Sequence, residues 1–291
     1  MFGKPFNTVK DLLILSRPNA WFVTAFSLSI GAVFAISNTS IDFTVLQKFV
    51  FLCIAFAPFI AGGLYVLNDV NDRKIDARNP GKCNRPIAAG RITQKQGMTF
   101  SFALLAIGLF LAFSISLLHL ALALALIFLQ LIYSMPPVRL KESSIDFLFS
   151  GPLNHMIRFI AAWAIFRPLS SLPIMLLASL FLLYCVAYIY YKIIDKEFVS
   201  EKSIARKKNI QKCLDLATIL GIALMFASIL LSEVDFLFIA CPTCLSALFL
   251  LQKAIPSSKR MPIFRNTFYG YAPFGLMLGT IGLWALIAIF Q

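Results

Sequence analysis

The sequence predicts an all-α, polytopic membrane protein with nine transmembrane helices in one bundle. Of its 291 residues, 59% are hydrophobic and only 13% are charged, whereas a soluble domain averages about 25% charged residues. Long uncharged runs alternate with charged segments, and Lys and Arg gather in every second charged segment. We therefore expect residues 1–291 to form a single domain embedded in a lipid bilayer.

Each expected helix is an apolar run of about 20 residues, the length that crosses a bilayer. The uncharged run over residues 96–138 is long enough for two helices, with a turn near residues 114–119. The nine expected spans are residues 20–41, 49–68, two within 96–138, 147–166, 168–191, 216–232, 236–252 and 266–291.

The distribution of Lys and Arg predicts the orientation of these spans. With the N-terminus in the cytoplasm, 23 of the 26 Lys and Arg residues fall in cytoplasmic segments, as the positive-inside rule requires. The sequence thus predicts a multi-pass membrane protein with its N-terminus and its active-site mouth on the cytoplasmic side and its C-terminus outside. The net charge of +13 has the same explanation, so no nucleic-acid partner is expected.

Residues 67–91, LNDVNDRKIDARNPGKCNRPIAAGR, form a polar segment between two charge-free runs. Three carboxylates, Asp69, Asp72 and Asp76, fall within eight residues, and Asn68 precedes them at the membrane boundary. On a helix, Asp69 and Asp76 would share a face, with Asp72 about 60° away. Clustered carboxylate and amide oxygens suit Mg²⁺. The alternative is a solvated, salt-bridged loop, because three basic residues lie close by: Arg73, Lys74 and Arg78.

Basic residues at two other cytoplasmic boundaries are candidates to bind phosphate. Arg139 and Lys141 follow two prolines, which prevent a helix from continuing and hold the cations in a stiff turn. Arg17 precedes Pro18 at the entrance to the first span, where a guanidinium can bind phosphate through two hydrogen bonds. The alternative for all three cations is ordinary positive-inside anchoring.

Four segments together resemble the UbiA superfamily of intramembrane prenyltransferases. Residues 68–76, NDVNDRKID, match the NDxxDxxxD motif of that superfamily, and residues 84–91, NRPIAAGR, resemble its RPxxxGR segment. Residues 16–18, SRP, and residues 133–141, YSMPPVRLK, resemble its first-span entrance and its loop after the fourth helix. The nine-span topology is also that of the superfamily. The resemblance implies one UbiA-like transmembrane prenyltransferase domain over residues 1–291.

A second acidic site, usual in this superfamily after the sixth span, is less regular here. Tyr188 and Lys192 precede Asp195 as the family pattern requires, but Val199 stands where the second acid is expected. We expect Asp195 to be the ligand of this second site, with Glu201 or Glu197 as its partner. The alternative is a solvated end of the loop.

The resemblance implies an enzyme that uses Mg²⁺ to transfer a prenyl group from a polyprenyl diphosphate to a lipophilic or aromatic acceptor. The implied catalytic residues are Asp72, Asp76 and Asp195, of which Asp76 is the candidate to orient or deprotonate the acceptor. The implied metal ligands are Asn68, Asp69, Asp72, Asp76, Asp195 and Glu201. The implied diphosphate-binding residues are Arg17, Arg85, Arg139, Lys141 and Lys192.

Three other functions remain open from the sequence. Residues 17–21, RPNAW, with Lys192 three residues before Asp195, also resemble the branch that moves phosphoribosyl onto polyprenyl phosphate. A solute transporter would be a different class of protein. Transporter sites lie near the bilayer midplane, whereas the acids of both predicted sites follow the spans. A lipid-binding scaffold would need no metal site.

His155 and Arg158 interrupt the fifth span, where ionisable groups face a cavity or a partner.

Overall fold

The computed structural model describes residues 5–36, 42–143, 145–149, 151–196, 204–239, 241–243, 245–246 and 250, with the side chains of residues 5–7, 190–211 and 237 left out. Every regular element in this part of the chain is a helix. The chain divides into two compact units, one within Met1–Ser29 and Ile41–Ser143, the other within Ile30–Ser40 and Ser144–Gln291.

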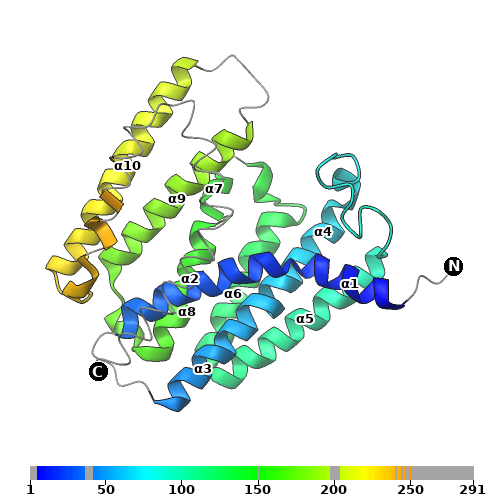
Figure 1. Cartoon of the computed structure of the whole chain (residues 1–291), viewed down its shortest axis with the longest axis horizontal. Helices are drawn as coiled ribbons and strands as arrows, with labels where there is room; N and C mark the ends of the chain where they lie inside the picture. The colour runs from blue at the N-terminus through cyan, green and yellow to red at the C-terminus, as the bar shows by residue number, and fades with distance from the viewer. Residues whose placement is uncertain are drawn as a thin grey trace. The chain divides into compact units, whose positions relative to one another are not determined.

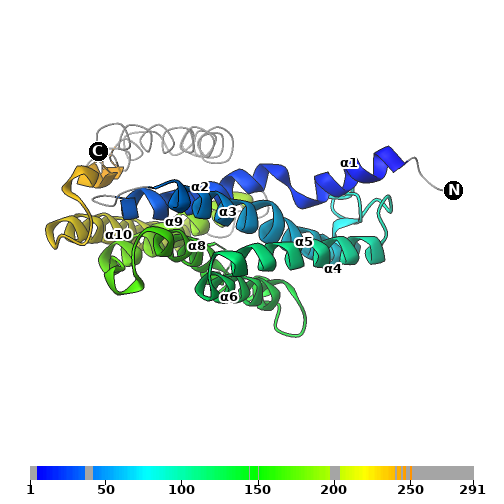
Figure 2. The ribbon, with the colours of Figure 1, turned by 90° about the horizontal axis from the view of Figure 1, so that it is seen from below.

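The first unit is a group of helices joined mostly by short connections, with a longer loop between α4 and α5 (Figure 1). Its helix α5 packs against α4 and against α6, and α1 packs against α4. Figure 2 shows α1 leading into α2. The elements of this unit are α1 Pro5–Ser16, the start of α2 Pro18–Ile36, α3 Phe43–Ile54, the π-helix η1 Ala55–Ala61, α4 Gly62–Asp76, α5 Gln94–Ile115, α6 Leu117–Ser134 and the 3₁₀ helix η2 Leu140–Glu142.

Helices α3, η1 and α4 form one uninterrupted helical run with a π-turn at its centre. Pro58 lies inside η1, and because proline has no backbone N–H it cannot complete the i→i−4 pattern at that point. The π-turn accommodates this defect. Gly108 of α5 lies against η1 so closely that a Cβ atom there would stand 2.6 Å from Cγ1 of Ile60 and 3.1 Å from the Ala55 carbonyl oxygen.

Helix α4 extends further than the sequence indicated. The expected span ended at residue 68, whereas α4 continues to Asp76, so all three carboxylates of the polar segment lie on its last two turns. No glycine or proline interrupts residues 64–76, and Arg73 and Lys74 in the last turn interact favourably with the helix dipole. The helix stops before the Asn79-Pro80-Gly81 turn, in which Asn79 Oδ1 accepts from Gly81 N at 2.9 Å.

The loop between α4 and α5 packs onto the first unit rather than extending into solvent. Ile87 and Ile92 are fully or almost fully buried and form one cluster with Leu15, Val66 and Val70. Arg91 ties the loop to α1, because its Nε donates to Asp11 Oδ1 at 3.1 Å. The loop ends in a capping box that begins α5, in which the side chains of Thr93 and Gln96 each accept a bond from the other's backbone N–H, an arrangement that satisfies two otherwise unpaired helix donors.

The second unit contains the end of α2 and a set of helices in which α9 packs between α8 and α10. Ser179 Oγ of α9 donates to the Gly221 carbonyl of α10 at 2.6 Å, and Arg167 Nε donates to the Ala35 carbonyl at 2.8 Å. Glu233 accepts from the Met175 backbone N–H at 2.9 Å, which places a carboxylate at the start of α9. The elements are α7 Asp146–Phe149, α8 Pro152–Phe166, η3 Leu169–Ser171, α9 Ile174–Lys196, α10 Ile204–Leu230 and η4 Phe236–Ile239.

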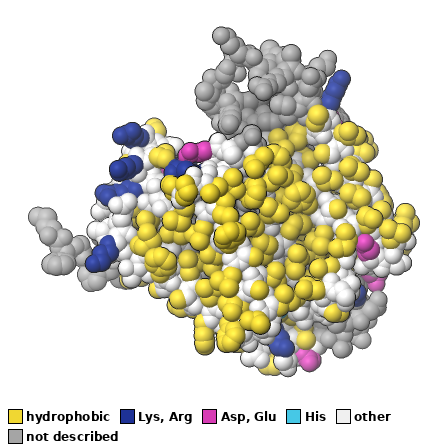
Figure 3. Space-filling model, turned by 180° about the vertical axis from the view of Figure 1, so that it is seen from behind, with side chains coloured by type: hydrophobic (Ala, Val, Ile, Leu, Met, Phe, Trp, Pro, Cys, Tyr) yellow, Lys and Arg dark blue, Asp and Glu magenta, His cyan; other side chains and the backbone are white. Residues whose placement is uncertain are grey.

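The described residues contain five segments that are long and apolar enough to cross a membrane, together with a shorter apolar helix over Ile174–Ile189. Hydrophobic side chains cover most of the face shown in Figure 3. The turn expected near residues 114–119 is present, because α5 ends at Ile115 and α6 begins at Leu117. The expected span over residues 266–291 lies outside the described residues. The five candidate spans are Thr8–Ile36, Phe43–Asp76, Gln94–Ile115, Leu117–Ser134 and Lys212–Leu230.

Replacing Gly108 with alanine is expected to destabilise the protein by about 1–3 kcal/mol, because the added methyl group overpacks the contact with η1. The measurement is the apparent melting temperature in detergent. Gly81→Ala is the matched control, since a Cβ there would meet only Asn79 Oδ1, at 3.5 Å. Equal melting temperatures for the two variants would show that η1 and α5 are not in close contact.

Candidate active site

The last two turns of α4 present their predicted ligands on one side of the helix. At about 100° per residue, Asn68, Asp69 and Asp76 all lie within about 60° of Asp72 around the helix axis. Asp69 and Asp76 are buried, and the Asp72 side chain is 18% exposed. Each of the three carboxylates is paired with a basic side chain from another part of the first unit.

Asp69 is held by two arginines. Arg17 Nη2 lies 2.5 Å from Asp69 Oδ1, and Arg85 Nη1 lies 3.0 Å from the same oxygen. The Arg17 guanidinium also lies over the ring of Tyr65, 4.8 Å from its centroid, in a cation–π contact. Tyr65 is one turn before Asp69, so both groups meet Arg17 on the same face of α4.

Arg85 joins two acids with a single nitrogen. Its Nη1 donates to Asp76 Oδ2 at 2.8 Å as well as to Asp69 Oδ1. Because Asp69 and Asp76 are only 4% and 3% exposed, their charges need compensating partners. Arg85 therefore fastens the loop that follows α4 back onto the helix from which it came.

Asp72 meets the other candidate phosphate-binding segment. Lys141 Nζ lies 2.7 Å from both Asp72 oxygens, and Arg139 Nη2 lies 3.1 Å from Oδ1. Arg139 Nε also contacts Glu142, whose side chain is 66% exposed. The segment after α6 therefore reaches the end of α4, although Asp72 and Lys141 are 69 residues apart in the sequence.

Two of these arginines adopt a backbone conformation that is unusual for residues other than glycine. Arg17 has φ 53° and Arg139 has φ 42°, both in the left-handed region, which costs of order 1 kcal/mol or more for such a residue. Arg17 occupies the break between α1 and α2, and Arg139 is the residue before η2. The surrounding structure thus holds both guanidinium groups in place against a local backbone preference.

The local charge of this cluster is positive. Three carboxylates near the C-terminal end of α4 oppose the helix dipole, whose negative end lies there. The four cationic side chains that pair with them, Arg17, Arg85, Arg139 and Lys141, leave one positive charge in excess. Glu142 contributes little to this balance, because it is largely solvated and its interaction is screened. The cluster is therefore suited to an anionic ligand.

Asn68 supplies an oxygen that no described residue satisfies. Its Oδ1 is buried without a hydrogen-bond partner, and it lies one turn before Asp72 on nearly the same face. A buried acceptor without a donor costs free energy, which a bound cation would offset. The described residues contain no group of three or more His, Cys, Asp or Glu side chains arranged to hold a metal ion, so such an ion would complete its shell with water or ligand oxygens.

The second predicted acidic site belongs to the second unit. Lys192 and Asp195 lie on the last turns of α9, but their side chains are outside what the structure describes, and Glu197 and Glu201 lie wholly outside the described residues. Elsewhere in this unit, His155 stacks on Tyr184 with ring centroids 4.1 Å apart. The metal role of Asp195 and of Glu201 or Glu197, and the diphosphate role of Lys192, stay predictions.

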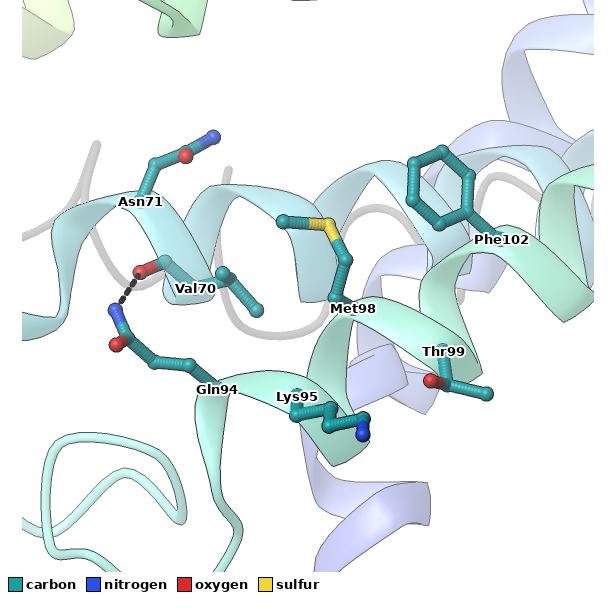
Figure 4. A pocket seen from close by; sticks show the side chains of 7 residues that line it. All are labelled: Val70, Asn71, Gln94, Lys95, Met98, Thr99 and Phe102. Atoms are coloured by element: carbon teal, nitrogen blue, oxygen red, sulfur yellow. Dashed lines mark hydrogen bonds between the residues drawn. The ribbon is translucent and has the colours of Figure 1, made fainter.

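A pocket of about 650 Å³ lies between α4 and α5, on a different face of α4 from the carboxylates. Val70, for example, lies about 160° around the helix from Asp72. In Figure 4 the Met98 side chain reaches from α5 toward α4, and the Gln94 amide donates to the Val70 carbonyl. None of the predicted metal ligands or phosphate-binding residues lines this pocket.

Two features of the cluster were not anticipated from the sequence. No sequence motif pointed to Tyr65. It lies four residues before Asp69, however, so on a helix it shares a face with that acid and would lie beside any arginine that pairs with it. The pairing of Arg85 with both Asp69 and Asp76 was also missed, because a short loop can return a side chain to either face of the preceding helix.

The fold and cluster define a class of protein: a helical membrane protein with an amide–carboxylate site at the end of a spanning helix, surrounded by arginine and lysine. Residues 23–269 match the model of the UbiA prenyltransferase family. The chain belongs to this family, and it is a multi-pass integral membrane protein.

Solved structures of family members share the fold. A UbiA homolog from Archaeoglobus fulgidus bound to GPP and Mg²⁺ matches with a TM-score of 0.70 at 19% identity, over 94% of this chain and 99% of that one. The homolog from the same organism bound to Cd²⁺ matches with a TM-score of 0.71 at 21% identity, over 94% and 98%.

Curated relatives match over parts of the sequence. Protoheme IX farnesyltransferase of Archaeoglobus fulgidus is 26% identical over 183 residues, 63% of this chain and 62% of the relative. Digeranylgeranylglyceryl phosphate synthase of Sulfolobus acidocaldarius is 37% identical over 36% and 35% of the two chains. Decaprenyl-phosphate phosphoribosyltransferase of Mycolicibacterium smegmatis is 32% identical over 36% and 33%. The chain therefore spans less than two thirds of the length of each of these relatives.

Replacing Arg85 with alanine is expected to lower stability by about 2–3 kcal/mol, because among the described residues Asp76 then has no side-chain partner and Asp69 keeps only Arg17. This is less than the roughly 3–5 kcal/mol for a fully buried pair, since the Arg85 side chain is 29% exposed. The measurement is chemical unfolding in detergent.

Two further variants make this test specific. Arg78→Ala, an exposed position in the same loop, should leave the unfolding midpoint unchanged. Adding Asp76→Asn to Arg85→Ala should restore part of the lost stability, because it removes one buried charge. If the double variant is no more stable than Arg85→Ala, Arg85 does not act by neutralising Asp76.

Proposed function

We propose that this protein is a prenyltransferase that uses Mg²⁺ to transfer a prenyl group from a polyprenyl diphosphate to a lipophilic or aromatic acceptor within the membrane. The observation that carries the proposal is the cluster at the end of α4. There, four cationic side chains surround three carboxylates with an excess of positive charge, beside an unsatisfied amide oxygen on Asn68. A diphosphate headgroup supplies the negative charge that this arrangement lacks.

The donor set at this cluster fits Mg²⁺. This ion takes one or two carboxylates and completes its shell with water and substrate phosphate oxygens. Asn68 and Asp72, one turn apart, would hold it here, with Asp69 and Asp76 as further candidate ligands behind their arginine partners. Asp195 and Glu201 are proposed as ligands of a second ion. When bound, the metal neutralises charge that develops on the departing diphosphate.

The basic residues of the chain bind and orient the diphosphate in this proposal. Arg139 and Lys141 lie beside Asp72 and would contact the diphosphate oxygens, while Arg17 and Arg85 add positive charge around it. Lys192 of the second unit is proposed as a further diphosphate-binding residue. Donors held in fixed positions stabilise the leaving group where its charge appears, which lowers the barrier to breaking the allylic C–O bond. Arginine suits this role because its planar group binds phosphate through two bonds.

The reaction then requires an acceptor and the exclusion of water. The allylic cation left by the departing diphosphate alkylates an acceptor carbon or oxygen, and the bundle excludes water that would otherwise hydrolyse it. Asp76 is the proposed residue that orients or deprotonates the acceptor. The proposal includes nine spans in one domain, with the N-terminus and the active-site loops in the cytoplasm and the C-terminus outside.

Phosphoribosyl transfer onto a polyprenyl phosphate is the second candidate function. It is favoured by the local similarity to the decaprenyl-phosphate phosphoribosyltransferase of Mycolicibacterium smegmatis. The same cluster would then bind the diphosphate of a phosphoribosyl donor, and the isoprenoid would be the acceptor. A transporter is less well supported, because the carboxylates here lie at a helix end and are paired with four cations rather than placed at a broken helix.

Purified protein with Mg²⁺ is expected to release pyrophosphate from a prenyl diphosphate of suitable length when a panel of lipophilic and aromatic acceptors is supplied. Release from phosphoribosyl diphosphate with a polyprenyl phosphate would support the second candidate instead. If no donor in either panel releases pyrophosphate, the proposed enzyme class is wrong. Where pyrophosphate is released, lipid mass spectrometry of a host with and without the gene would identify the product.

Replacing Asp72 with asparagine is expected to lower turnover about 100-fold or more, because the site loses its principal charged metal ligand. The matched control is Asp42→Asn, since Asp42 is the exposed N-cap of α3 and asparagine caps helices equally well. Turnover and its Mg²⁺ dependence are measured for both. An Asp72 variant that retains both would rule out the metal role of this residue, even if the enzyme class is right.

A further inference from the structure

The ammonium group of Lys141 contacts both oxygens of Asp72, the carboxylate that is proposed to bind the metal. Its ammonium nitrogen lies 2.7 Å from Asp72 Oδ1 and 2.7 Å from Oδ2, so it bridges the two oxygens symmetrically. Both side chains are largely withdrawn from solvent, with Lys141 16% and Asp72 18% exposed. A cation that binds Asp72 between its two oxygens must first displace this ammonium group.

The neighbouring groups make this displacement unfavourable for a lone metal ion. Arg139 Nη2 lies 3.1 Å from Asp72 Oδ1, so this carboxylate already faces two positive charges. A divalent ion added to the cluster would increase the existing excess of positive charge, and it would also leave Lys141 without its partner. Like charges a few ångströms apart, shielded from water, repel strongly.

A diphosphate that arrives with the ion reverses this balance. Its anionic oxygens give the Lys141 ammonium a new partner and compensate the charge of the metal. Lysine can follow the anion, because its charge lies at the end of a flexible four-carbon chain. Its backbone, in contrast, lies in the single turn of η2 next to Arg139, so only the side chain needs to move.

We infer that Lys141 is an exchangeable cation that holds Asp72 until a diphosphate arrives, so that this site takes a metal–diphosphate complex and binds a free divalent ion only weakly. This inference rests on the proposed function, because it assigns the form in which that function's donor enters. Asn68 supports it: its oxygen is buried and unpaired in the described structure, as expected for a ligand position that is filled only when the complex binds.

The direct test measures metal binding rather than turnover. Full-length protein in detergent is titrated with Mn²⁺, and free Mn²⁺ is followed by electron paramagnetic resonance. The titration is repeated with geranyl S-thiolodiphosphate, an unreactive donor analogue. The native protein should bind Mn²⁺ weakly alone and at least tenfold more tightly with the analogue. Lys141→Met should bind Mn²⁺ alone at least tenfold more tightly than the native protein does, and should gain less from the analogue.

The matched control removes the same charge from a nearby position. Lys74 is exposed on α4, two residues after Asp72, and Lys74→Met should change Mn²⁺ affinity by no more than about twofold. If Lys141→Met and Lys74→Met bind Mn²⁺ alone equally tightly, the inference is overturned. This outcome is separate from a failure of the proposed function, which would appear as absent pyrophosphate release whatever the metal affinity.

A measurement on the native chain covers the case in which Lys141→Met does not fold. Lysine acetylation by a water-soluble reagent, located by mass spectrometry, reports whether each ammonium group is free to react. Saturating Mn²⁺ without the analogue should increase the labelling of Lys141 severalfold and leave that of Lys74 unchanged. Unchanged labelling of Lys141 while Mn²⁺ is bound would show that the ion and the ammonium group do not exchange.

Discussion

The pairing of Arg85 with Asp69 and Asp76 is the interaction on which the rest of the described site depends. Helix α4 ends in buried carboxylates, which oppose the helix dipole and cannot stay charged in an apolar environment without partners. Arg85 provides one group that serves both acids. The same contact brings the loop back to the helix, where Ile87 and Ile92 complete the adjacent apolar cluster. Charge compensation and core packing thus reinforce each other.

The three carboxylates of α4 have similar sequence contexts but different basic partners. Asp69 and Asp76 are paired with guanidinium groups that enter from α1–α2 and from the following loop. Asp72 instead meets a segment that follows α6, and one of its partners is a lysine, which is more mobile than an arginine. The acid with the most exchangeable partner is also the one next to an unsatisfied amide oxygen.

The sequence predicted the parts of this structure that depend on local patterns. The apolar runs and the hairpin between α5 and α6 follow from composition and spacing, and the family follows from short motifs. The pairing of Lys141 with Asp72 could not be predicted, because it depends on how α6 packs and not on any pattern near either residue. The end of the expected span was placed at residue 68 because polar residues begin there, whereas hydrogen bonding along the helix backbone continues to Asp76. The second acidic site, at Asp195 and Glu201, stays a prediction.

Ser116 is shared by two helices, as the C-cap of α5 and the N-cap of α6, and its side chain accepts from the backbone N–H of His119. A hairpin with a single connecting residue has no slack along the helix axes. The depth at which α6 ends is therefore set by where α5 begins, at its Thr93–Gln96 capping box. The lengths of α5 and α6 therefore set the depth of Lys141 along the helix axes. Inserting one residue into either helix would shift Lys141 by about 1.5 Å along the axis and rotate it away from Asp72.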